Sequence, residues 1–145
     1  MDYTRDFSAV KRVVIKVGTN VLSRDGAVDE AFLGVIARQI TALRQTGRQV
    51  ILVTSGAIGM GAGALELAKP PKPVKLRQAC AAVGQGILMH AYRQAFAESH
   101  QQVAQVLLTN AILSNRKQYV NLKNSVETLL GLGVVPIVNE NDCVS

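Results

Sequence analysis

Tryptophan is absent from this 145-residue sequence, and all aromatic residues together make up 4% of it. Only two cysteines occur, Cys80 and Cys143, and they are neither close in sequence nor accompanied by histidines at a metal-ligand spacing. Zinc sites and disulfide frameworks need such spacings, so we expect free thiols and no structural metal.

Long apolar segments are missing as well. No uninterrupted run approaches the roughly 18 residues that indicate a membrane-spanning helix. Residues 1–6 lack the apolar centre of a secretory signal. We therefore expect a cytoplasmic protein without membrane contact.

Acidic residues are scarce in the middle of the chain. Glu66 and Glu98 are the only two between Ala31 and Val126, against eleven lysines and arginines, and the whole chain carries a formal charge of +6. A polyanionic partner such as a nucleotide would suit this charge. The basic residues are scattered singly, however, whereas nucleic-acid-binding surfaces gather them in patches, so no nucleic acid partner is expected.

The sequence does have enough apolar residues, 48%, for one domain with a hydrophobic core. Four short apolar segments are typical of buried parallel strands, at residues 13–17, 49–53, 103–108 and 134–138. Helical periodicity or helix-favouring composition is found between them, at residues 29–45, 64–68, 74–97 and 115–132. The alternation predicts an α/β fold, an αβα sandwich with a mostly parallel central sheet.

Three of the expected strands end in residues that carry chemistry. These ends are Lys16 with Gly18, Thr54-Ser55-Gly56, and Asn139-Glu140-Asn141-Asp142. Open α/β sheets bind their ligands at the carboxyl ends of the strands. Together the three ends predict one site for an anionic substrate and a phosphate donor.

The first two strand ends each have a functional and a structural interpretation. Lys16 would neutralise a transferring phosphoryl group, with Gly18 letting the ligand approach the backbone, or it extends from the strand end to solvent. Ser55, with the backbone amides of Gly56 and Ala57, would bind a carboxylate, or it is the N-cap of a helix.

The third strand end is the richest in polar groups. Asp142 and its neighbours Asn139, Glu140 and Asn141 would bind a substrate ammonium or help to place a metal-bound nucleotide, or they close a turn. Four consecutive polar side chains exceed what a turn needs, which favours function. His90 and His100 lie far in sequence from all three strand ends and are expected to be structural.

The expected helix at residues 74–97 is rich in small residues. Ala79, Ala81, Ala82 and Gly84 permit another helix to approach closely, either in the core or at a subunit interface. This composition motivates the expectation of a homo-oligomer, a dimer or a tetramer.

Three segments resemble the amino acid kinase family, and within it the members that act on glutamate. They are VVIKVGTN at residues 13–20, VILVTSGAIGMG at residues 50–61 and VVPIVNENDCV at residues 134–144. AAVGQ at residues 81–85 and QVLLT at residues 105–109 extend the resemblance over nearly the whole chain.

The resemblance implies transfer of the γ-phosphoryl group of ATP, with Mg²⁺, to the side-chain carboxylate of L-glutamate. This would be the first step of proline biosynthesis, with proline as a feedback inhibitor. It also implies that Lys16 contacts the ATP phosphates, and that Ser55 and Asp142 hold the α-carboxylate and the ammonium group of glutamate. No tightly bound cofactor is implied.

Members of the family carry most of their nucleotide-binding residues beyond the last of these segments. We therefore expect residues 1–145 to be the N-terminal, amino-acid-binding part of such a domain, truncated before the nucleotide-binding half and inactive alone. Two alternatives stay open: a kinase of the same fold with a different acceptor, and a non-catalytic module that senses glutamate or proline.

Overall fold

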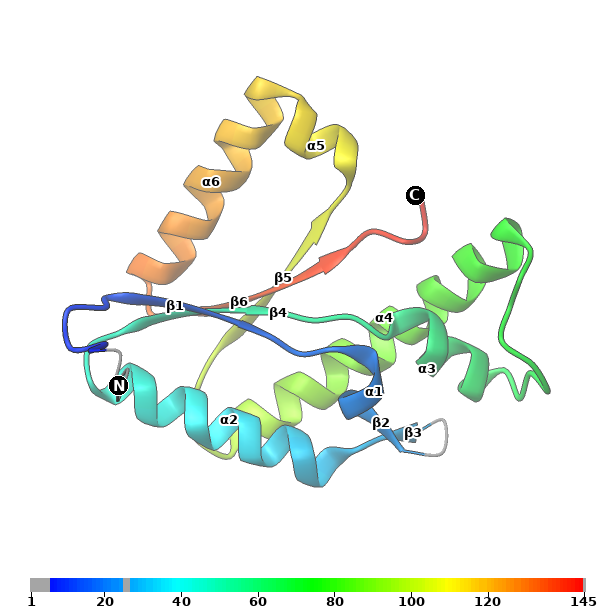
Figure 1. Ribbon diagram of the computed structural model, residues 1–145, viewed down its shortest axis with the longest axis horizontal. Helices are drawn as coiled ribbons and strands as arrows, with labels where there is room; N and C mark the ends of the chain where they lie inside the picture. The colour runs from blue at the N-terminus through cyan, green and yellow to red at the C-terminus, as the bar shows by residue number, and fades with distance from the viewer. Residues whose placement is uncertain (1–5, 25–26, 145) are drawn as a thin grey trace, which may run out of the picture.

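The computed structural model describes residues 6–24 and 27–144. At its centre is a four-stranded sheet in the order β1-β4-β6-β5, and its three strand pairings are all parallel. The strands are β1 (Arg12–Lys16), β4 (Gln49–Val53), β5 (Val103–Leu108) and β6 (Val135–Glu140). Because all four run the same way, their carboxyl ends meet at one edge of the sheet (Figure 1).

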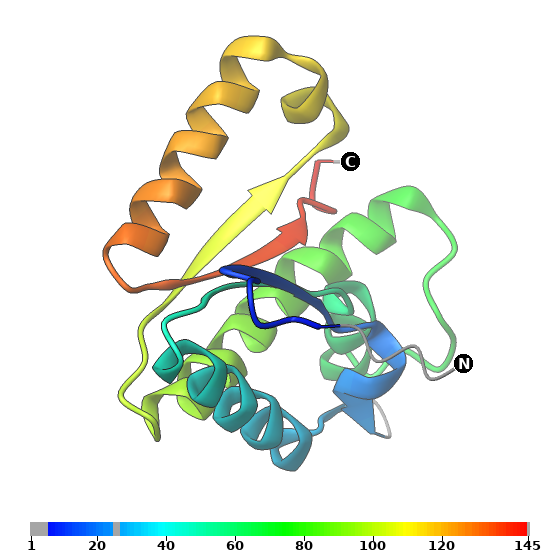
Figure 2. The same cartoon turned by 60° about the vertical axis from the view of Figure 1, so that its left-hand side comes forward.

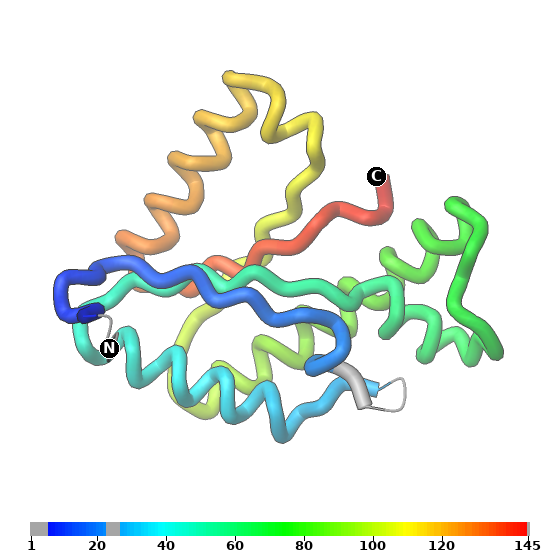
Figure 3. The backbone as a smooth tube through the Cα atoms, in the orientation of Figure 1, coloured from blue at the N-terminus to red at the C-terminus, as the bar shows by residue number. Residues whose placement is uncertain are grey.

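Helices cover both faces of the sheet, as the predicted sandwich requires (Figures 1 and 2). On one face lie α2 (Glu30–Gln45), α3 (Ala57–Ala64) and α4 (Val74–Ala97). On the other lie α5 (Asn110–Ser114) and α6 (Arg116–Gly131), which the chain follows between β5 and β6 (Figure 3). After β1, a short helix α1 (Thr19–Leu22) leads into a small antiparallel hairpin of β2 (Ser23–Arg24) and β3 (Ala27–Val28).

Most of the long elements were predicted closely, because local signals set their ends. The bounds of α4, β4 and β5 agree with the predicted segments. The side chain of Asp29 caps α2 by accepting a hydrogen bond from the backbone nitrogen of Phe32, and Asn115 caps α6 in the same way through Gln118. Both caps satisfy a backbone N–H group that the helix itself leaves unpaired.

Three expectations about the elements are wrong. The helix expected at residues 64–68 lies earlier, as α3, and begins directly after Gly56. The last strand continues through Asn139 to Glu140 instead of ending at Val138. The strand predicted at residues 13–17 is not buried on both faces, because β1 is an edge strand and Val14 is 61% exposed. The sequence also gave no indication of α1, α5 or the β2–β3 hairpin.

Helices α3 and α4 pack with their backbones in close contact. A Cβ atom at Gly84 would overlap the carbonyl oxygen of Ala57, and one at Gly61 would overlap the carbonyl oxygen of Cys80. Ala81 and Gly84 are therefore part of the core and not of a subunit interface, the other role considered for the small residues of α4. Ala79 and Ala82 are exposed, so a subunit interface on their side of α4 stays a prediction.

We expect Gly84→Ala to lower the free energy of unfolding by about 1–3 kcal/mol or more, because the added methyl group has no space between α3 and α4. Urea unfolding of the complete protein measures this. Gly86→Ala in the same helix is the matched control: its Cβ meets no atom within 4 Å. That control should stabilise the protein by about 0.5–1 kcal/mol, since alanine favours a helix interior. Equal effects of the two changes would contradict the packing described.

Candidate functional site

A cavity of about 310 Å³ lies at the carboxyl ends of three strands. It is lined by the ends of β4, β5 and β6 and the residues after them, including Thr54, Ser55, Thr109, Asn110, Asn139, Glu140 and Asp142. The fold thus brings together two of the three strand ends singled out in the sequence, although they are more than 80 residues apart in the chain. The end of β5 was not singled out.

Asn139 lines this cavity and is only 4% exposed. Its Oδ1 accepts a hydrogen bond from the backbone nitrogen of Glu140 at 2.9 Å, and its Nδ2 donates to Oε1 of Gln85 at 2.8 Å. Gln85 lies on α4 and in turn donates from Nε2 to Oε1 of Gln105 on β5 at 3.1 Å. A chain of three side-chain amides therefore links α4 to the middle of β5 and to the end of β6.

Asp142 is one of two acids that line the cavity, and unlike Glu140 it is partly buried. Desolvation raises the pKa of its carboxyl group above the ordinary value, and the charge of Glu140 raises it further, while Arg77 acts in the opposite direction. Arg77 and Gln78 of α4 line a second cavity of about 240 Å³, which Glu140 and Asp142 also border. Asp142 thus lines both cavities and lies near Arg77, whose positive charge favours the ionised form of its carboxyl group.

Ser55 connects the end of β4 to the end of β1. Its Oγ lies 3.1 Å from Oγ1 of Thr19 and 3.4 Å from the backbone oxygen of Val17. It is not the helix N-cap considered from the sequence, because α3 is capped by Gly56 and no side chain bonds to that cap. Gly56 has φ +102°, a left-handed conformation that favours glycine, and Ala57, the first residue of α3, is buried.

Thr54 and Tyr92 form a second buried link between α4 and a strand end. Their hydroxyl oxygens lie 2.8 Å apart. Burial raises the pKa of Tyr92 to about 12, although the hydrogen bond with Thr54 lowers it somewhat. Tyr92 is therefore neutral at physiological pH. The sequence analysis missed Tyr92, Gln85 and Thr109, since a single polar residue in an apolar helix or after a strand gives no local signal of its partner.

Lys16 and Gly18 lie at the same edge of the sheet but do not line the cavity. Lys16 is the last residue of β1, is exposed, and pairs in register with Val53 of β4. Gly18 is also exposed, its φ is not in the left-handed region, and a Cβ there would meet no described atom within 4 Å. Neither backbone conformation nor packing requires glycine at this position.

Asn141 is likewise not among the residues that line the cavity. Its backbone nitrogen donates to the backbone oxygen of Leu108 at 2.7 Å, which ties the segment after β6 to the end of β5.

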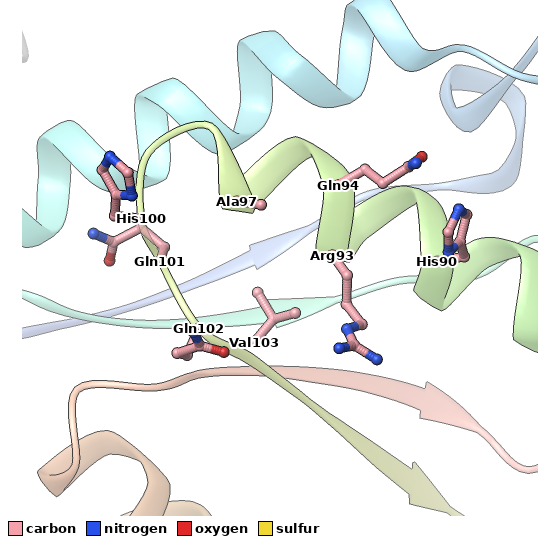
Figure 4. A pocket seen from close by; sticks show the side chains of 8 residues that line it. All are labelled: His90, Arg93, Gln94, Ala97, His100, Gln101, Gln102 and Val103. Carbon is pink, nitrogen blue, oxygen red and sulfur yellow. The ribbon is translucent and has the colours of Figure 1, made fainter.

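A separate cavity of about 530 Å³ lies elsewhere in the molecule (Figure 4). It is formed by the last turns of α4 and the residues leading into β5, so it is at the opposite end of the sheet from Asp142. His90, Arg93 and His100 line it, and all three are exposed. Neither histidine belongs to the buried core, and their expected structural role stays a prediction.

In the described residues, 6–24 and 27–144, no three His, Cys, Asp or Glu side chains are grouped so as to hold a metal ion. None of the helices there combines the length and apolar composition needed to cross a membrane. Both cysteines are free, Cys80 in the core and Cys143 partly exposed.

Comparison with known proteins gives consistent results. Residues 11–145 match the model of the amino acid kinase family. The chain is 47% identical to glutamate 5-kinase of Methanosarcina mazei and 49% identical to that of Methanococcoides burtonii, over 94% and 91% of its own length. It spans 38% and 36% of the length of these two relatives.

A solved structure supports the fold independently. The carbamate kinase of Giardia superposes with a TM-score of 0.57 over 90% of this chain and 58% of its own, at 20% sequence identity. Together with the family match over residues 11–145, this confirms the predicted architecture: the chain belongs to the amino acid kinase family.

Proposed function

We propose that the protein containing these residues is a glutamate 5-kinase, which transfers the γ-phosphoryl group of ATP to the side-chain carboxylate of L-glutamate. The main support is the identity of 47–49% with glutamate 5-kinases over more than nine-tenths of the chain. Because the chain spans well under half of those relatives, the proposal concerns the whole protein, and residues 1–145 supply its amino-acid-binding part.

Glutamate is proposed to bind in the cavity at the ends of β4, β5 and β6. The Asp142 carboxylate would hold its ammonium group, since that carboxylate faces the cavity and is partly shielded from water. The Ser55 hydroxyl and the backbone amides at Gly56 and Ala57, which start α3, would bind its α-carboxylate. Asn139 and Asn141 complete the substrate-binding segment, by shaping it or by contacting glutamate.

The ATP phosphates are proposed to lie over the end of β1. Lys16 is a cation at this edge, and the open space beside Gly18 leaves room for a phosphate near the backbone. In the reaction an oxygen of the glutamate side chain forms a bond to the γ-phosphorus while the bond from that phosphorus to ADP breaks. Lys16 would neutralise charge on the transferring oxygens. Mg²⁺ would arrive with ATP, coordinated by its phosphates.

Proline is proposed as the feedback inhibitor of this first step of its own synthesis. It carries an α-carboxylate and an ammonium nitrogen with the same spacing as glutamate, so Ser55 and Asp142 offer it the same two contacts. An assembly into a dimer or tetramer is also proposed, with the exposed small residues of α4, among them Ala79 and Ala82, at an interface.

The test of this function is an acyl-hydroxamate assay on the complete protein, expressed to its natural stop codon. With ATP, magnesium, hydroxylamine and glutamate we expect hydroxamate, because hydroxylamine traps the acyl phosphate. Aspartate and acetylglutamate should give none. A signal with one of these acceptors in place of glutamate would identify a different kinase of the same fold. Glutamate binding by calorimetry without any hydroxamate would identify the sensor.

Lys16→Ala separates catalysis from binding in the same protein. Removing the cation should lower kcat by about 100-fold or more, because it acts on charge that develops in the transition state. Glutamate affinity should change little. The matched control is Lys11→Ala, an exposed lysine just before the other end of β1. Unchanged kcat in Lys16→Ala would remove this residue from the mechanism.

Asp142→Asn should raise KM for glutamate by about 30-fold or more, because a shielded carboxylate that pairs with an ammonium is lost. KM for ATP should stay near its original value. Asp29→Asn is the control, since asparagine still caps α2. An increase in KM for glutamate of less than twofold would contradict the assignment.

The wild-type protein should also show a pH dependence that Asp142→Asn lacks. The raised pKa of Asp142 means that its carboxylate takes up a proton at a higher pH than an ordinary aspartate does. Protonation removes the charge that holds the ammonium group. KM for glutamate should therefore rise as the pH falls toward this pKa, and steady-state kinetics across the acidic range measure the effect.

A further inference from the structure

The three side-chain amides of Asn139, Gln85 and Gln105 form a chain of hydrogen bonds that begins at the backbone N–H of Glu140. The chemistry of that N–H group decides how the amides are oriented. The backbone N–H of Glu140 only donates, so the atom of Asn139 that faces it must be the oxygen, Oδ1. This places Nδ2 of Asn139 toward Gln85, which must then present its oxygen to Asn139 and its NH₂ group to Gln105. The orientation of all three side-chain amides follows from a single peptide group.

The side chain at position 85 must accept a hydrogen bond from Asn139 and donate one to Gln105, and it must be as long as glutamine to reach both. Glutamate would accept from Asn139 but could not donate to Gln105 when ionised, and methionine would do neither. Asparagine is one methylene shorter. Gln85 is buried, so any group left unpaired there would be cut off from water, which makes the requirement strict.

The placement of Gln85 on α4 gives the amide chain a rigid base. Gly84, the preceding residue, is packed against the backbone of Ala57 at the start of α3. Tyr92, two turns further along α4, bonds to Thr54 at the end of β4. The same helix thus touches the segment that carries Ser55 and, through Gln85, the segment that carries Asp142.

We infer that Gln85 is a positioning residue for substrate binding: through Asn139 it fixes the backbone at Glu140, the last residue of β6, and with it the segment that presents Asp142 to the cavity. The expected effect on KM for glutamate rests on the proposed function. The expected effect on the mobility of residues 139–144 rests on the hydrogen bonds alone. Gln85 does not line the cavity, so it acts without touching the substrate.

Gln85→Met in the complete protein tests the inference. With the acceptor for Asn139 lost, the segment of residues 139–144 should become more mobile, and KM for glutamate should rise by about tenfold. KM for ATP should change less than twofold. The matched control is Gln94→Met, at an exposed position of the same helix, which should leave both constants unchanged.

A double-mutant cycle distinguishes positioning from general damage to the core. If Gln85 acts through Asn139, then Gln85→Met combined with Asn139→Ala should raise KM for glutamate no further than Asn139→Ala alone. Additive effects of the two changes would overturn the inference, because they would show that Gln85 acts by another route.

Hydrogen–deuterium exchange provides a readout that does not need activity. In Gln85→Met, the peptide covering residues 139–144 should exchange about tenfold faster than in Gln94→Met. Unchanged exchange there would overturn the inference whether or not the protein phosphorylates glutamate. Absence of hydroxamate from the wild type would instead refute the proposed function. The exchange rate of residues 139–144 would still decide whether Gln85 positions that segment.

Gln105→Met supplies a second variant, should Gln85→Met fail to fold. Gln105 is exposed, so its replacement disturbs the core little, yet it removes the acceptor for the NH₂ group of Gln85. The same changes in exchange and in KM for glutamate are expected with smaller size, about two- to threefold. No change in either quantity would count against the amide chain as a positioning device.

Discussion

The arrangement of the candidate site depends on the close contact between α3 and α4. At Gly61 and Gly84 the two helices approach so closely that neither position has room for a Cβ atom. The contact places α4 beneath the carboxyl end of the sheet, with its polar residues within reach of the strands. Since α3 begins at Ala57, two residues after Ser55, this contact also fixes where the backbone leaves β4.

Polar groups near this contact are paired with each other before any ligand arrives. Thr54 bonds to Tyr92, and Asn139 bonds to Gln85. Throughout the described residues no buried side-chain nitrogen or oxygen lacks a hydrogen-bond partner. Such pairing holds a site rigid, because moving any one group would leave another unsatisfied in a low-dielectric environment. Asp142 differs, since it is partly exposed and so available to a substrate.

Local signals in the sequence were enough to predict the long helices and strands, but not which elements pack beside each other in the fold. Asp29 and Asn115 reveal the starts of α2 and α6 because a cap acts on residues only three positions away. The glycines of α3 argue against a helix when taken alone, and it is packing against α4 that favours one. Strand order depends on contacts between distant segments, which is why the edge position of β1, and the exposure of Lys16 with it, could not be predicted.

The candidate site was predictable where polar residues end an apolar strand. Ser55, Asn139 and Asp142 were found this way, and they do line one cavity. The supporting residues were not predictable. Gln85 meets its partner 54 positions later in the chain, and nothing near it in sequence marks it as different from an ordinary helical glutamine.

The order of strands in the sheet also bears on how this domain folds. β6 is the last of the four strands in the chain, yet it lies between β4 and β5. Before β6 inserts, the edges of β4 and β5 that will pair with it have no partner strand and are open to the surroundings. Such non-local pairing slows folding and favours association of incompletely folded chains. Because the strand that joins β4 to β5 leads directly into the segment of Asp142, the insertion that bridges these two strands also brings Asp142 to the candidate site.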